Sequence, residues 1–84
     1  MNSDEIKIVL LQEIGNIAPE ADLSKVDPAA DFREELDIDS IGFLNLIIAL
    51  AERLKIPIPE RDYACLRTIE SAIGYLTAAK QQGA

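Results

Sequence analysis

The sequence predicts a small all-α domain. We expect a four-helix bundle with three main helices, one short third helix and a long loop between helices one and two. Apolar residues recur at three- and four-residue steps in three segments, and no segment alternates as a strand does. The length of 84 residues suits one domain, so we expect residues 1–84 to fold as a single unit. The hydrophobic content of 49% is too high for a disordered chain.

The first helix is predicted over Ser3 to Ile17. Asn2 or Ser3 can cap its start, and Pro19 stops it. Its apolar stripe consists of Ile6, Val9, Leu10, Ile14 and Ile17.

A connection of more than 20 residues follows, over residues 18–39. Pro19 and Pro28 argue against a strand there. A connection this long in a compact domain is usually functional or ordered by contacts of its own. The apolar residues expected to make those contacts are Leu23, Val26, Phe32 and Leu36.

The second helix is predicted over Ser40 to Lys55, with Asp39 as its N-cap and Pro57 beyond its end. A short third helix is expected around Arg61–Leu66. The last helix is expected over Thr68 to Lys80, where Thr68 caps an apolar stripe. That stripe consists of Ile69, Ala72, Ile73 and Leu76.

The second helix is apolar around nearly its whole circumference, more than the other helices of so short a chain can enclose. One face is expected in the core, namely Phe43, Leu46, Ile47, Leu50 and Leu54. The second apolar stripe consists of Ile41, Leu44, Ile48 and Ala51. Pattern alone favours two outcomes equally: the long loop buries this stripe, or the stripe is exposed and serves as a docking site.

The charge of the chain is uneven. Its net charge is −7, and residues 1–39 hold eleven acids against three bases. Nucleic acid is therefore an unexpected partner, whereas a partner with a basic surface is steered towards the first half. The longest uncharged run, from Ser40 to Ala51, is too short to span a bilayer, so no membrane insertion is expected.

The single cysteine, Cys65, excludes an internal disulfide and is expected to be a small core hydrophobe beside Leu66. The polar, acidic N-terminus does not resemble a signal peptide. We therefore expect a protein of the reducing cytoplasm.

Ser40, in the stretch Asp39-Ser40-Ile41, is the candidate functional residue. Its simplest interpretation is as part of a helix start, because Asp and Ser are common N-caps. Nucleophilic catalysis requires an activating base, usually His, and the chain has no His. No catalytic residue is therefore predicted, and the protein is not expected to be an enzyme.

A calcium loop is a further interpretation of this stretch. Asp37, Asp39 and Gly42 match positions 1, 3 and 6 of an EF-hand loop. Ile41 and Ile48 then occupy two positions that need side-chain oxygens, and no metal site is predicted.

The stretch from Asp31 to Leu76 resembles the acyl carrier protein family. That family has Asp-Ser-Leu at the start of its second helix, where this chain has Asp39-Ser40-Ile41. The segments Ile56-Pro57-Ile58-Pro59-Glu60 and Thr68–Leu76 are similar to the family's next loop and last helix. Leu36 and Ile38 before the serine, and Leu46 and Leu50 after it, complete the resemblance.

The resemblance implies a discrete carrier that holds acyl intermediates as thioesters on 4′-phosphopantetheine attached to Ser40. It implies a phosphopantetheinyl transferase and acyl-loading and acyl-processing enzymes as partners, with the carrier a monomer. The alternative is an interaction module that keeps the carrier fold without the prosthetic arm.

The chain departs from the family along the second helix. Gly42 and Asn45 stand where acids are common, while acids gather in the preceding loop. A specialised pathway (polyketide, lipid or amino-acyl) is therefore expected, in place of housekeeping fatty acid synthesis. The residues expected to recognise partners are Asp39, Ile41, Leu44, Ile48 and Glu52.

An acyl pocket between the second and third helices is also suggested by the resemblance. Its candidate lining is Ile47, Leu50, Ile58, Tyr63 and Leu66, which are equally expected as plain core. Tyr63 is bulkier than the small residue common there, so a small cavity for short or polar acyl groups is expected.

Overall fold

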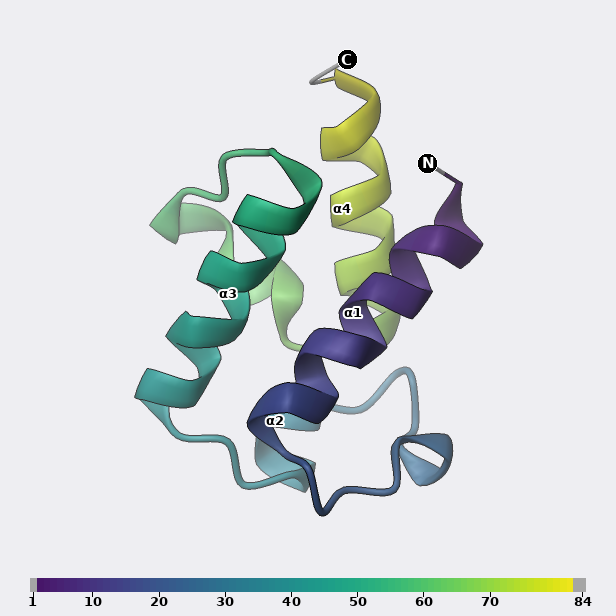
Figure 1. Cartoon of the computed structure of the whole chain (residues 1–84), viewed down its shortest axis with the longest axis vertical. Coiled ribbons are helices and arrows are strands. Elements are labelled where there is room, and N and C mark those ends of the chain that lie inside the picture. The colour runs from purple at the N-terminus through teal and green to yellow at the C-terminus, as the bar shows by residue number, and fades with distance from the viewer. Residues whose placement is uncertain (1, 83–84) are drawn as a thin grey trace.

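A computed structural model describes residues 2–82; residues 1, 83 and 84 of the predicted domain lie outside the described part (Figure 1). The elements in chain order are α1 (Ser3–Ile17), η1 (Leu23–Lys25), α2 (Phe32–Glu35), α3 (Ser40–Leu54), η2 (Glu60–Leu66) and α4 (Ile69–Gln82). In Figure 1, α1 runs diagonally in front, α3 lies to its left, α4 rises behind it towards the top, and the loop with η1 and α2 closes the lower end. The predicted all-α bundle is confirmed.

Helix α1 has the predicted bounds. Asn2 caps it through a capping box: Asn2 Oδ1 accepts from the Glu5 N–H at 2.9 Å, and Glu5 Oε1 accepts from the Asn2 N–H at 3.2 Å. These bonds satisfy backbone donors that a helix start leaves without partners. Its buried face is Ile6, Val9, Leu10 and Ile14.

The core lies between α1, α3 and α4 and is almost wholly aliphatic. The predicted core face of α3 is confirmed, because Phe43, Leu46, Ile47, Leu50 and Leu54 are all buried. Leu76 and Ala72 of α4 complete the core from the other side. The described residues bury no polar or charged side chain in this core.

The long connection is ordered by contacts of its own, as expected, but it also contains two short helices that the sequence did not predict. Asp31 caps α2, where its Oδ1 accepts from the Arg33 and Glu34 N–H groups at 3.0 and 3.3 Å. Phe32 is fully buried, whereas Leu23, Val26 and Leu36 pack partly buried against the core. A four-residue helix of this kind depends on its cap and one buried anchor, and therefore leaves no periodic signal.

The loop is fixed to the start of α4. The Phe32 N–H donates to the Arg67 carbonyl at 3.1 Å, and the Glu70 N–H donates to the Pro28 carbonyl at 2.9 Å. The path of the loop is thereby set across the lower end of the bundle in Figure 1, away from the outer flank of α3.

The predicted ends of the later helices differ slightly from the structure. Lys55 follows α3 in the left-handed conformation, with φ of 57°. The Lys80 Nζ donates to the Leu54 carbonyl at 2.8 Å and so caps that end of α3. The short third helix is a 3-10 helix, and α4 is capped by Thr68, whose Oγ1 accepts from the Ser71 N–H at 3.0 Å.

The prediction for Cys65 is wrong: its side chain is exposed. Its neighbour Leu66 enters the core at 1% exposure, so adjacent positions of η2 face opposite ways. Within residues 2–82, no helix has the length and apolar character required to cross a membrane.

Candidate functional site at the start of α3

Ser40 is the first residue of α3 and is exposed. Asp39 caps the helix as predicted, with its Oδ1 accepting from the Gly42 N–H at 2.7 Å. Gly42 fits closely here, because a Cβ at this position would lie 3.2 Å from both Asp39 Oδ1 and Ile38 Cγ2. The cap therefore turns the chain tightly and leaves the Ser40 hydroxyl on the outside.

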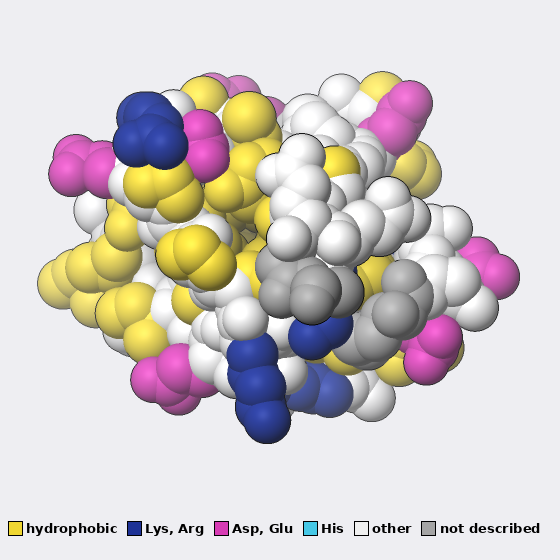
Figure 2. Space-filling view, turned by 90° about the horizontal axis from the view of Figure 1, so that it is seen from above, with side chains coloured by type: hydrophobic (Ala, Val, Ile, Leu, Met, Phe, Trp, Pro, Cys, Tyr) yellow, Lys and Arg dark blue, Asp and Glu magenta, His cyan; other side chains and the backbone are white. Residues whose placement is uncertain are grey.

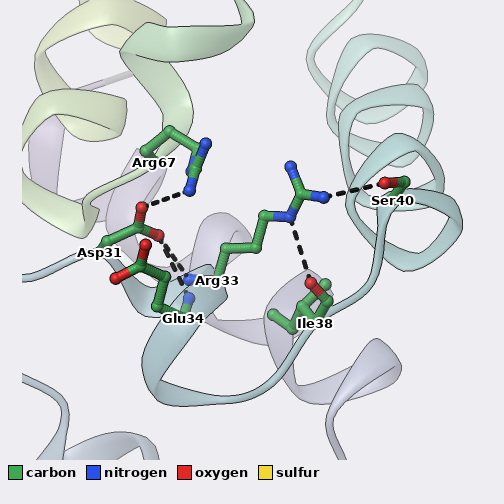
Figure 3. A network of polar contacts seen from close by, with 6 residues as sticks. All are labelled: Asp31, Arg33, Glu34, Ile38, Ser40 and Arg67. Carbon is green, nitrogen blue, oxygen red and sulfur yellow. Dashed lines mark hydrogen bonds and ion pairs between the residues drawn. The ribbon is translucent and has the colours of Figure 1, made fainter.

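Arg33 reaches from α2 to this serine, a contact that the sequence reasoning missed (Figure 3). Its Nη2 donates to Ser40 Oγ at 3.0 Å, and its Nε donates to the Ile38 carbonyl at 3.1 Å. The guanidinium carbon lies 5.1 Å from the centre of the Phe43 ring, within the range of a cation–π contact. The half-buried side chain of Arg33 thus links α2 to the residue before the α3 cap and to Ser40.

A second arginine supports α2 from the other side. Arg67 forms an ion pair with Asp31 (Figure 3). Its guanidinium carbon also lies 6.0 Å from the centre of the Phe43 ring. Burial acts to raise the pKa of Asp31, but hydrogen bonds from Arg67 and from the Glu34 and Arg33 N–H groups outweigh it. The pKa of Asp31 therefore lies below its ordinary value, and this carboxylate stays ionised while it caps α2.

The second apolar stripe of α3 is exposed. Ile41, Leu44 and Ile48 keep 71%, 43% and 46% of their surface accessible, and Ala51 is half-buried. Hydrophobic side chains are visible at the surface on the side where α3 lies (Figure 2). Glu52 is exposed one turn beyond Ile48. The sequence pattern left open whether the long loop buries this stripe or leaves it exposed, and in the structure the stripe is exposed.

Three of the five predicted acyl-pocket residues lie in the core. Ile47, Leu50 and Leu66 are at most 2% exposed, whereas Ile58 and Tyr63 are half-buried against them. A hollow of about 740 Å³ lies between residues 57–62 and α4, and only Ile58 of the predicted set lines it. The acyl pocket between α3 and η2 stays a prediction.

The edge of this hollow is fixed by a tyrosine. The Tyr75 hydroxyl donates to Asp62 Oδ2 at 2.7 Å. Burial first, and then the Asp62 hydrogen bond and charge, raise the pKa of Tyr75 to about 12.

No three His, Cys, Asp or Glu side chains among residues 2–82 gather as metal ligands would.

Comparison with known proteins identifies the family. The family model described as a phosphopantetheine attachment site matches residues 9–76. The chain belongs to the acyl carrier protein family. Its members are carriers without catalytic activity of their own, and their cofactor is covalently attached 4′-phosphopantetheine. They work with a phosphopantetheinyl transferase and with biosynthetic enzymes.

The relatives cover most of the chain. An acyl carrier protein of Micrococcus luteus is 29% identical over 95% of this chain and 99% of its own length. Another, of Rubrobacter xylanophilus, is 36% identical over 80% of this chain and 86% of its own. A meromycolate extension acyl carrier protein of Mycolicibacterium aurum is 27% identical over 87% of this chain and 71% of its own.

Proposed function

We propose that this protein is a discrete, monomeric, cytoplasmic acyl carrier with Ser40 as the residue that bears the cofactor. The observation that carries the proposal is an exposed serine at the start of α3 whose Oγ lies 3.0 Å from a guanidinium nitrogen. The cofactor is joined through a phosphodiester, which is an anion. An exposed hydroxyl beside a cation and a helix start is therefore a suitable site for attaching this anionic group.

In the loading reaction, the chain supplies the nucleophile, the Ser40 hydroxyl, and the transferase supplies the base that deprotonates it. Ser40 Oγ attacks the phosphorus of coenzyme A that bears pantetheine, forming a new O–P bond. The bond from that phosphorus to adenosine 3′,5′-bisphosphate breaks, and a base of the transferase takes the serine proton. The chain has no His, so the base is assigned to the partner. When bound, the cofactor supplies a thiol that forms thioesters with acyl groups.

Partner recognition is assigned to the surface beside Ser40. The exposed side chains of Ile41, Leu44 and Ile48 form an apolar stripe, and Asp39 and Glu52 add carboxylates near its two ends. Apolar helix faces of this kind dock in hydrophobic grooves. We propose that both the transferase and the acyl-processing enzymes bind this surface.

A specialised pathway, polyketide, lipid or amino-acyl, is the finer part of the proposal. It is supported by Gly42 and Asn45, which leave the first turns of α3 without acidic side chains. One relative is named for meromycolate extension, a specialised lipid role of that protein. Loading of the holo-protein by a general fatty-acid malonyl transferase as fast as that enzyme's own carrier would contradict this part.

The attachment residue is tested by intact mass. Incubation with coenzyme A and a phosphopantetheinyl transferase should add one arm of ~340 Da, as expected for a group carrier. The Ser40→Ala variant should gain nothing. Ser24→Ala is the matched control, because Ser24 is also an exposed serine near a helix start that an Asp caps, and this variant should load like the wild type.

Two results would contradict the proposal. Loading of Ser40→Ala would move the attachment site elsewhere. No mass gain with several transferases, together with partner binding that Ser40→Ala leaves unchanged, would instead identify an interaction module without the arm.

A further inference from the structure

The guanidinium of Arg33 is held in a defined place. Its Nε is anchored on the Ile38 carbonyl at 3.1 Å, and its face lies near the Phe43 ring at 5.1 Å. These two contacts leave the outer edge of the group directed at Ser40, as Figure 3 shows. Arg33 therefore presents its Nη2–H to the serine oxygen from a fixed position, with little conformational freedom left to lose.

The surroundings of Ser40 are otherwise acidic. Glu34, Glu35, Asp37 and Asp39 are all exposed around this turn. Arg33 is the one Lys or Arg in residues 26–52, and nearby Arg67 is already paired with Asp31. An anion attached at Ser40 would therefore be repelled by neighbouring carboxylates, with Arg33 as its available counter-charge.

We propose that Arg33 is the phosphate-binding residue of the loaded carrier, an inference that rests on Ser40 being the attachment residue. Here its Nη2–H donates to the serine hydroxyl at 3.0 Å. Once that oxygen is esterified, the negative charge lies on the two unesterified phosphate oxygens, which are two bonds from the serine oxygen. These oxygens are stronger acceptors than the ester oxygen, so the hydrogen bond passes to them.

The second terminal nitrogen of Arg33 makes two-point binding possible. Nη1 donates to no group within residues 2–82, whereas Nε and Nη2 are both engaged. A guanidinium has a planar fork of donors that suits two phosphate oxygens at once. Arg33 thereby holds the phosphate of the arm against α2. In this way it sets the direction in which the arm leaves the protein.

The test is a comparison of the wild-type protein before and after loading, with mass spectrometry first establishing that Ser40 carries the arm. The side-chain N–H resonances of Arg33 are then followed by ¹⁵N NMR. We expect the Arg33 Nη signals to shift and to sharpen into separate resonances on loading. Those of Arg67, which is held by Asp31, should remain in place. Unchanged Arg33 signals in a protein shown to be loaded would overturn the inference while leaving the proposed function intact.

Variants provide a second readout through the ³¹P resonance of the loaded protein. Arg33→Gln should move that resonance, and Arg33→Lys, which keeps the charge but not the fork, should move it less. Arg53→Gln is the matched control, because Arg53 pairs with Glu13 near the far end of α3, and it should leave the resonance unchanged. Equal ³¹P shifts for the wild type and Arg33→Gln would refute the contact. If Arg33→Gln fails to fold, the wild-type comparison alone decides the question.

Discussion

Replacement of Ile41 by alanine tests whether the exposed stripe of α3 is a docking surface. Fully burying an isoleucine side chain contributes about 1.5–3 kcal/mol. Ile41 keeps 71% of its surface exposed in the isolated protein, so roughly 1–2 kcal/mol remains to be gained on binding. Alanine keeps only the β-carbon, and the expected loss is about 1 kcal/mol, or roughly fivefold in affinity.

The assay is the kcat/KM of a phosphopantetheinyl transferase for the carrier, measured beside thermal unfolding. We expect kcat/KM to fall about fivefold with no fall in Tm, because Ile41 contributes little to the core and alanine is the better helix former. Ile8→Ala is the matched control: Ile8 is 57% exposed on α1, and this variant should leave both quantities unchanged.

The outcome is decided by comparison of the two variants. If Ile41→Ala and Ile8→Ala have the same kcat/KM, the stripe does not contact the transferase and the argument fails. If Ile41→Ala instead lowers Tm by several degrees, its side chain stabilises the fold, and the reduced kcat/KM has another cause.

Two further predictions concern the fold that positions the site. Phe32→Ala removes a fully buried ring that anchors α2, so we expect a loss of about 3–5 kcal/mol in the free energy of unfolding, measured by urea denaturation. A loss below about 1 kcal/mol would show that α2 does not depend on this anchor. Tyr75→Phe removes the hydrogen bond to Asp62, at a cost of about 1 kcal/mol below pH 10. Because the folded pKa of Tyr75 is raised to about 12 from 10.0, the wild type should lose this stability as pH rises from 10 to 12. Tyr75→Phe should show a smaller decline over that interval, and equal declines would assign the pH dependence to other groups.

The sequence predicted the long elements well because their periodicity and caps act locally. The bounds of α1 and the start of α3 follow from Asn2 and Asp39, each placed before a run of apolar residues. The family and the candidate serine were also accessible from sequence, since the Asp-Ser-Ile motif lies at the start of that second run. These features need no knowledge of what packs against them.

The parts that the sequence did not predict depend on tertiary contacts. Arg33 was visible only as an isolated base in an acidic loop, and its direction is set by the Ile38 carbonyl and the Phe43 ring. The exposure of the Ile41 stripe depended on where the loop runs, which bonds to the start of α4 decide. Cys65 was misassigned because seven residues of η2 are too few to establish which side faces the core.

The separation of charge from apolar surface suggests how the proposed carrier would select its partners. The carboxylates lie mainly in the loop before Ser40, whereas the stripe on α3 is apolar until Glu52. Exposed charges act mainly on the rate of encounter and are screened within about 8 Å at physiological salt. Apolar contacts act mainly on the rate of dissociation and are little affected by salt. In the proposed docking mode, the acidic loop therefore brings any basic enzyme to Ser40, and only an enzyme with a groove fitted to Ile41, Leu44 and Ile48 remains bound long enough to react.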